Sequence, residues 1–223
     1  MYDHQIFFID KPLHWSSFDV VKKLRGLLQV KKIGHAGTLD PLATGLLIVG
    51  TGKKTKELGR YQLMPKQYEG IIDIGKTTPS HDLGTSFDST LGYDGIQEEQ
   101  IQKALQILTG SQNQVPPLYS AIKLKGKRAY EFARKGKSIT LAPRKVVVYS
   151  FIATQIVLPS IHFRITCSKG TYIRSLARDL GKQLGTGAFL RSLIRTGIGD
   201  ISIANAYTIE DMRNLVSRQV LAK

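Results

Sequence analysis

The sequence predicts an α+β fold, because segments with strand and helix patterns follow one another in mixed order, without the regular alternation of a doubly wound fold. The chain has 223 residues, of which 42% are hydrophobic, so it can bury a core and disorder is not expected. It contains no linker, low-complexity tract or internal repeat. We therefore expect a single domain over residues 1–223.

The first third of the chain predicts two strands around a helix and a loop. Ile6 to Asp10 is typical of a short buried strand, and Ser16 and Ser17 are candidate N-caps of the helix that follows. Four apolar residues of this helix share one face: Phe18, Val21, Leu24 and Leu28. A glycine-rich loop is expected from Gly34 to Gly45. Next come an apolar strand, a basic helix and another strand: Leu46 to Val49, Lys53 to Leu63 and Gln67 to Ile74.

The rest of the chain predicts a long loop, then paired strands between helices. Thr77 to Gly95 is polar and turn-rich, and a helix follows that ends near Gly110. Ser120 to Leu124 and Lys127 to Arg134 suggest a strand and a helix, and Val146 to Thr166 suggests two paired strands. The helix Tyr172 to Leu184 has two faces, one with Ile173, Leu176, Ala177 and Leu180, the other with Arg174, Arg178 and Lys182. A final helix is expected to start at Thr208, with Asp211 completing a capping box.

The charge of the chain indicates a polyanionic partner. Lys and Arg number 32 against 17 Asp and Glu, which gives a formal net charge of +15 and favours nucleic acid over a membrane surface or a neutral metabolite. The single cysteine, Cys167, cannot form an internal disulfide, and the five histidines show no zinc-ligand spacing. The N-terminus has no secretion signal, so we expect a cytoplasmic protein.

One segment matches the phosphate-loop pattern of nucleotide-hydrolysing enzymes. Gly70 to Thr77 reads GIIDIGKT, but a working phosphate loop needs a helix that starts at its Lys-Thr pair. Here Pro79 follows closely and restricts Thr78 to extended geometry. We interpret the match as coincidental. Magnesium-dependent binding of ATP or GTP would instead indicate a working phosphate loop.

A second segment, GHAGTLDPLATG from Gly34 to Gly45, surrounds one acid with small residues. Asp40 is its only carboxylate, and the glycines let a backbone or a planar ligand approach closely. An Asp followed by Pro is also a common helix N-cap, and residue types alone leave both interpretations open.

Several segments in the same order resemble TruB-type tRNA pseudouridine synthases. The run GHAGTLDPLATGLL resembles the signature of that family, and Lys11-Pro12 with Ser16-Ser17 resembles its first motif. VPPLYSAIKLKGKRAYEFARKG from Val115 to Gly136 and CSKGTYIRSLARDLG from Cys167 to Gly181 are similar to further family blocks. Two departures are visible: His14 replaces a usual glycine, and the usual double arginine reads Leu193-Ile194-Arg195-Thr196, so that one positive contact is expected to be absent.

The resemblance implies a pseudouridine synthase fold: a mixed, mainly antiparallel sheet flanked by helices and loops, with a central RNA-binding cleft. It also implies isomerisation of uridine to pseudouridine at position 55, in the T arm of tRNA, on a flipped-out nucleotide. In the matching positions Asp40 is the nucleophile, Arg174 supplies the opposing charge, and Tyr68 stacks on the base. The competing interpretations are a solvated helix arginine for Arg174 and an ordinary strand tyrosine for Tyr68.

The family pattern assigns further residues to substrate binding. His35 corresponds to the residue that fills the space left by the flipped nucleotide, Tyr172 and Leu193 line the uracil pocket, and Lys11 belongs to the first motif. A polar turn residue and core packing are the competing interpretations of His35 and Leu193. Phosphate contacts are expected from a set of basic residues: Lys22, Lys23, Lys31, Lys32, Lys53, Lys54, Lys56, Lys123, Lys125, Lys127 and Arg128.

The expected partner is the T-arm stem-loop of tRNA, without a membrane or an obligate protein partner, and the protein is expected to be a monomer. No cofactor is expected, because the reaction involves no redox change and no atom gained. Family members often carry a C-terminal PUA-type RNA-binding domain, and we expect none here because the sequence ends at Lys223. A second hypothesis, based on the positive charge, is a tRNA-folding helper whose turnover is incidental. Equal acceleration of tRNA folding by wild type and Asp40→Asn would support that hypothesis.

Overall fold

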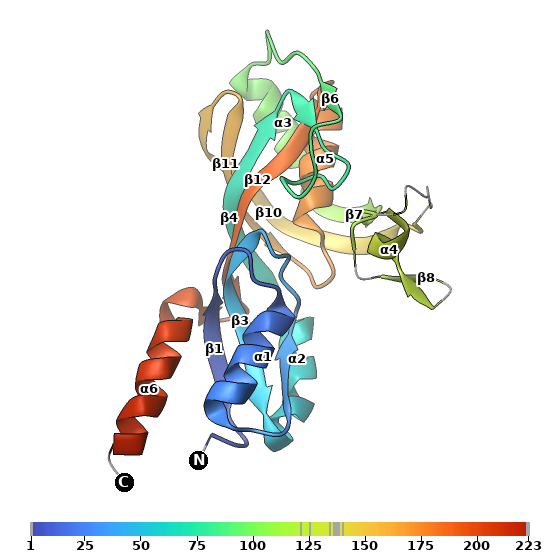
Figure 1. The fold of residues 1–223 in the computed structure, drawn as a ribbon. Coiled ribbons are helices and arrows are strands. Elements are labelled where there is room, and N and C mark those ends of the chain that lie inside the picture. The colour runs from blue at the N-terminus through green and yellow to red at the C-terminus, as the bar shows by residue number, and fades with distance from the viewer. Residues whose placement is uncertain are drawn as a thin grey trace. The chain divides into compact units, whose positions relative to one another are not determined.

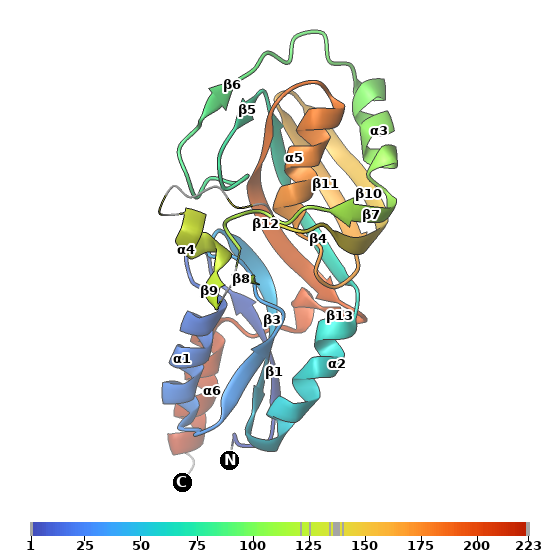
Figure 2. The same ribbon diagram turned by 90° about the vertical axis from the view of Figure 1, so that its right-hand side faces the viewer.

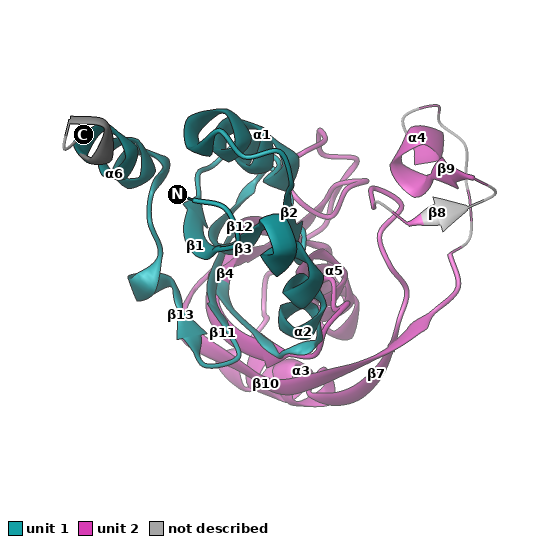
Figure 3. Ribbon diagram, turned by 90° about the horizontal axis from the view of Figure 1, so that it is seen from below, with its two compact units in different colours: residues 1–69, 193–223 teal, residues 70–192 magenta. Residues whose placement is uncertain are grey.

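A computed structural model of the chain describes residues 2–120, 122–124, 126–133, 135, 139 and 141–221. The chain divides into two compact units, which are coloured separately in Figure 3. Unit 1 contains residues 1–69 and 193–223, and unit 2 contains residues 70–192. Two strands have residues in both units: β4 (Lys66–Ile74) and β12 (Ala188–Ile198). The expectation of one domain over the whole chain stays a prediction.

Unit 1 is built on a sheet covered by helices (Figure 1). Its strand order is β1-β3-β12-β4, and β2 also pairs with β3 and β13 with β12. The remaining bounds in unit 1 are β1 (Ile6–Lys11), α1 (Ser17–Leu28), β2 (Ile33–Ala36), β3 (Ala43–Thr51), η1 (Gly52–Glu57), α2 (Leu58–Leu63), β13 (Ile201–Ser202), η2 (Ile203–Asn205) and α6 (Ile209–Leu221). β1 and β2 are antiparallel to β3, whereas β12 is parallel to it, with Leu193 opposite Ala43.

Two apolar clusters hold unit 1 together. The larger one packs α1 and α6 against the sheet, and its fully buried members include Ile9, Val20 and Leu24. The smaller one packs α2 on the sheet through Leu58 and Tyr61. Burial of each such side chain contributes roughly 1.5–3 kcal/mol, which fixes the strands from which the loops of this unit project.

In unit 2 the strand order of the sheet is β12-β4-β11-β10-β7. Its remaining bounds are β5 (Lys76–Thr77), β6 (Ser89–Thr90), α3 (Glu98–Ile107), β7 (Gly110–Gln114), β8 (Lys123–Leu124), β9 (Lys127–Arg128), α4 (Ala129–Ala133), β10 (Arg144–Val157), β11 (Ser160–Cys167) and α5 (Ile173–Gln183). β10 pairs antiparallel with both β11 and β7, and α3 contacts β10 and α5 (Figure 2). A mixed, mainly antiparallel sheet with helices is therefore confirmed.

Most expected elements are present, with three corrections. Phe18 is 62% exposed and does not belong to the buried face of α1, because Ser17 turns inward to bind the backbone of Leu39. The expected loop from Gly34 to Gly45 is shorter, since β2 and β3 take up its two ends and leave residues 37–42. The expected helix Lys53 to Leu63 begins as a 3₁₀ turn, η1, before α2.

Two other expectations are confirmed at the level of local structure. Gly70 to Thr77 lies in β4 and β5, with no helix at Lys76-Thr77, so the phosphate-loop match is coincidental. Thr208 and Asp211 form the capping box of α6, because each side chain binds the backbone amide of the other residue. In the described part of the chain, no helix is long and apolar enough to cross a membrane.

Candidate active site

The loop of residues 37–42 in unit 1, here named the Asp40 loop, is held by hydrogen bonds from three directions. The hydroxyl of Ser17 accepts from the amide of Leu39 at 2.9 Å and donates to its carbonyl at 3.3 Å. The amide of His14 donates to the carbonyl of Pro41 at 2.8 Å, and the amide of Ala43 donates to the carbonyl of Asp40 at 3.0 Å. The Asp40 side chain is half-buried. Its backbone is thus fixed in a place that solvent reaches only in part.

Lys11 places a buried positive charge in the electrostatic range of Asp40. Its side chain is fully buried at the end of β1, and its ammonium donates to the carbonyls of Pro12 at 2.9 Å and Trp15 at 2.6 Å. Burial lowers the pKa of Lys11 to about 8, and the negative charge of Asp40 opposes this shift. The interaction is mutual, so Lys11 favours the ionised form of Asp40.

The lowered pKa of Lys11 predicts opposite pH effects on activity and stability. The folded-state pKa of about 8 lies below the ordinary 10.5, so the unfolded chain binds this proton more tightly. The contribution of Lys11 to folding stability is therefore least favourable below about pH 8 and increases with pH between these two values. The same deprotonation removes a positive charge near Asp40. We expect the single-turnover rate to fall as pH passes through about 8 without a parallel loss of stability from Lys11.

The control for this prediction is Lys11→Met, which lacks the charge at every pH. This variant should react more slowly and show no pH limb near 8. Single-turnover rates and urea unfolding, both measured against pH, check the two halves of the prediction. A wild-type rate that stays flat through this range would contradict it.

Three other expected site residues also lie in unit 1. His35, on β2, is half-buried, and burial together with the charge of Arg195 lowers its pKa, so its imidazole is neutral at physiological pH. Its Nδ1 has no hydrogen-bond partner among the described residues. Tyr68, on β4, is 8% exposed, and Leu193, on β12, is half-buried opposite Ala43. Unit 1 therefore contains Lys11, His35, Asp40, Tyr68 and Leu193.

Arg174, in unit 2, is buried and bound by neighbouring groups, which rules out the alternative of a solvated helix arginine. Only 4% of the residue is exposed. Its guanidinium donates to the carbonyls of Ser80 at 3.1 Å and Tyr119 at 3.0 Å, and it pairs with Asp82 at 3.4 Å. A buried arginine is tolerated here because a carboxylate and two carbonyls replace its hydration.

Asp82 and Gln114 are buried polar residues that the sequence interpretation missed. Asp82 accepts from the hydroxyl of Ser80 and from the amide of Gly84 at 2.9 Å, which orients the carboxylate toward Arg174. The Gln114 side-chain amide binds both backbone groups of Tyr172, at 2.8 and 3.1 Å, and so fixes the start of α5. Asp82 stood in a polar, turn-rich stretch and Gln114 in an edge strand, and neither carried a pattern that distinguishes burial from exposure.

The basic residues expected to contact phosphates are mainly surface residues. Lys22, Lys31, Lys32, Lys53 and Lys56 in unit 1 and Lys127 and Arg128 in unit 2 are exposed. Lys54 forms an ion pair with Glu57 at 2.6 Å. Lys125 and the side chain of Lys123 lie outside the described residues.

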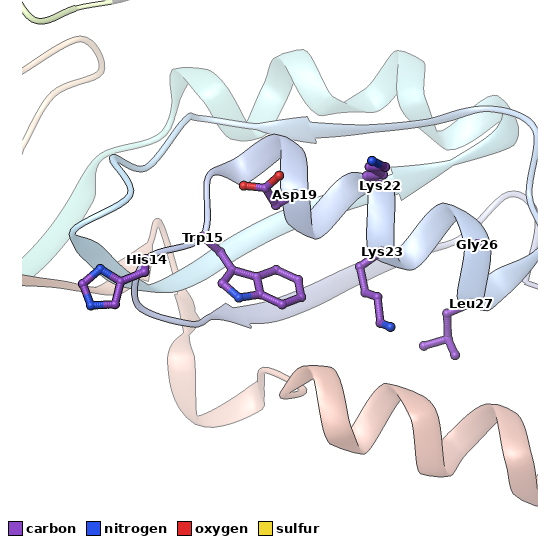
Figure 4. Close-up of a pocket in the computed structure, with 7 residues that line it drawn as sticks. All are labelled: His14, Trp15, Asp19, Lys22, Lys23, Gly26 and Leu27. Atoms are coloured by element: carbon purple, nitrogen blue, oxygen red, sulfur yellow. The ribbon is translucent and has the colours of Figure 1, made fainter.

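An open pocket of about 750 Å³ lies along α1 (Figure 4). Its lining consists of His14, Trp15, Asp19, Lys22, Lys23, Gly26 and Leu27. His14 also binds Pro41 through its backbone, so one wall of the pocket is attached to the Asp40 loop. No group of three or more His, Cys, Asp or Glu that could hold a metal ion occurs in the described part of the chain.

Two family models together match nearly the whole chain. Residues 25–173 match the TruB family pseudouridylate synthase (N terminal domain), and residues 174–222 match the tRNA pseudouridylate synthase B C-terminal domain. A Flavobacterium johnsoniae protein named tRNA pseudouridine synthase B is 50% identical over 212 residues, which cover 92% of this chain and 93% of that protein. A protein of the same name from Chloroherpeton thalassium is 46% identical, over 94% of this chain and 89% of that protein.

Solved structures agree with the fold. A Cbf5-Nop10-Gar1 complex contains a chain with a TM-score of 0.73 and 26% identity, covering 97% of this chain and 54% of that chain. The archaeal box H/ACA sRNP Nop10-Cbf5 complex gives a TM-score of 0.72 at 22% identity, over 96% and 54%. This chain thus spans about half the length of those chains.

The fold and the family models define the class of the protein, which is a pseudouridine synthase and therefore an isomerase. Within this class, the relatives named tRNA pseudouridine synthase B are 46–50% identical to this chain over most of both chains. The chain belongs to the TruB family of pseudouridylate synthases.

Proposed function

We propose that this protein converts a uridine in the T arm of tRNA, at position 55, to pseudouridine, with Asp40 as the nucleophile. Relatives that match over most of both chains are named tRNA pseudouridine synthase B, and the reaction is accordingly uridine isomerisation in tRNA. The T arm and the role of Asp40 are the parts that go beyond the names of these relatives. The T arm rests on the family resemblance of the sequence motifs. The observation that supports the role of Asp40 is the buried cation Lys11 within the electrostatic range of a fixed, half-buried Asp40.

The reaction breaks the bond from ribose C1′ to uracil N1 and forms a bond from C1′ to C5. The C5 proton is lost, N1 gains a proton, and no atom or electron is gained or lost overall. An anionic nucleophile holds one fragment while the base turns, and Asp40 is the acid proposed for this step. Lys11 supports it by favouring the carboxylate over the carboxylic acid.

Arg174 and Tyr68 are proposed to complete the catalytic group. Arg174 is held by Ser80, Tyr119 and Asp82, so its orientation is set before substrate binds. In the proposal its guanidinium supplies the positive charge that opposes the nucleophilic carboxylate. Tyr68 stacks on the flipped uracil and replaces the stacking that the base loses, and its hydroxyl assists removal of the C5 proton.

Substrate binding is proposed to use His35, Tyr172, Leu193 and Lys11, with surface lysines on the phosphates. His35 can take the stacking role as a neutral imidazole, because burial and the charge of Arg195 lower its pKa. Gln114 fixes the backbone of Tyr172 and so restricts where the tyrosine side chain can lie. We further propose a cytoplasmic monomer that needs no obligate protein partner.

Tritium release from two RNA hairpins tests the proposed site. One hairpin has the sequence of a tRNA T arm with uridines tritiated at C5, and the other differs only by cytidine in place of the target uridine. We expect one equivalent of tritium from the first hairpin and none from the second. Equal release from both hairpins would contradict the T-arm assignment. Release from a third, tritiated anticodon-arm hairpin but not from the T-arm hairpin would also contradict it.

A further inference from the structure

We propose that Arg195 is a positioning residue that sets the geometry of the Asp40 loop through its hydrogen bonds. The inference rests on the proposed function, because it assumes that the carboxylate of Asp40 is the reacting group. Arg195 lies on β12 in unit 1, and only 1% of the residue is exposed, so it is not a candidate for contact with phosphate.

The guanidinium of Arg195 bridges the first residue of the Asp40 loop and strand β3. Its terminal nitrogen donates to the carbonyl of Gly37 at 2.9 Å, directly where β2 has ended and the loop begins. Its Nε donates to the carbonyl of Leu46 at 2.7 Å, on β3 just after the loop. One rigid planar group therefore ties the first residue of the loop that carries Asp40 to the strand that follows it, and a single ammonium cannot reproduce that fork of donors.

Two glycines, one at the start of the Asp40 loop and one on β3, lie beside Arg195 and have positive φ angles. A Cβ atom on Gly37 would lie 3.4 Å from a terminal nitrogen of Arg195, and Gly37 has a φ of +74°. A Cβ atom on Gly45 would lie 2.4 Å from the backbone oxygen of Arg195, at a φ of +100°. Gly45 is thus explained by the close approach of the β12 backbone at Arg195, and both glycines by their positive φ, whereas a Cβ atom on Gly37 would make only an ordinary contact with the guanidinium.

Arg195 also contributes charge where Asp40 needs it. Its hydrogen bonds to the carbonyls of Gly37 and Leu46 replace water but leave the positive charge in place. The field of this charge reaches the neighbouring groups, since it lowers the pKa of both Lys11 and His35. The same field favours a negative charge on Asp40.

The test separates kcat from KM in two variants. Arg195→Lys keeps the charge but loses the fork, and Arg195→Gln keeps a planar donor but loses the charge. For either folded variant we expect kcat to fall by about 100-fold, because a small displacement of a reacting group costs about that much, while KM for tRNA changes by less than about threefold.

A matched control separates positioning from general stability. Leu24→Ala removes a fully buried side chain from the core of unit 1 and should lower the melting temperature, with kcat per folded molecule unchanged. If a folded Arg195 variant keeps kcat within about threefold of wild type, or if neither variant folds at low temperature, Arg195 serves stability alone and the inference is overturned. Asp40→Asn is measured beside them: an active Asp40→Asn refutes the proposed nucleophile, whereas an inactive one with active Arg195 variants refutes only the role of Arg195.

Discussion

Asp40→Asn is expected to bind tRNA with nearly wild-type affinity and to release no measurable tritium from tRNA labelled at C5 of uridine. The carboxamide has almost the shape of the carboxylate, so the hydrogen bonds of the Asp40 loop through Ser17, His14 and Ala43 remain. It has no negative charge with which to attack. Loss of a nucleophile typically lowers kcat by about 10⁴-fold or more, and we expect a loss of this order.

The control for Asp40→Asn is Asp200→Asn, which changes an exposed acid between β12 and β13. Filter binding and tritium release are measured on the same preparations. The control should match wild type in both. Tritium release by Asp40→Asn above about one tenth of the wild-type rate would remove Asp40 from the mechanism, since truncation of an essential nucleophile does not leave such activity.

Arg174→Lys is expected to produce the second largest loss, with a single-turnover rate lower by about 100-fold or more. Lysine keeps the positive charge but has no planar fork, so it cannot serve Ser80, Tyr119 and Asp82 together. The carboxylate of Asp82 would then lose its geometry in a buried setting, and we also expect a lower melting temperature.

Arg178→Lys is the matched control, one turn further along α5. Arg178 interacts with Asp179 and the carbonyl of Val115 and is more exposed than Arg174. Its replacement should leave the single-turnover rate within about twofold, because its ion pair with Asp179 is partly exposed to solvent. Equal rate losses for both substitutions would show that α5 tolerates no arginine replacement and that Arg174 has no special role.

Much of the fold was predictable because local patterns and tertiary packing agree. The strand at Ile6, the capped helix after Ser16 and the paired strands of β10 and β11 all follow from apolar spacing and cap residues. The strand β12 was not predicted, because its buried face contains Arg195, and a charged residue in a sequence is normally expected to be exposed.

The candidate site was predictable only in part, and for a similar reason. The resemblance named Asp40, Tyr68 and Arg174, whereas the residues that fix them depend on long-range contacts. Asp82 meets Arg174 across 92 positions of sequence, and Arg195 meets Gly37 across 158. Charged residues are buried when distant carbonyls or carboxylates replace their hydration, and no local pattern in the sequence records such partners.

The most direct test of the account is chemical mapping of pseudouridine, nucleotide by nucleotide, in a T-arm hairpin treated with wild type or Asp40→Asn. We expect full conversion of one uridine, at the T-loop target, by the wild-type protein and no pseudouridine anywhere after treatment with the variant. Pseudouridine at that same uridine after treatment with Asp40→Asn, or no pseudouridine in the hairpin with wild type, would contradict the account.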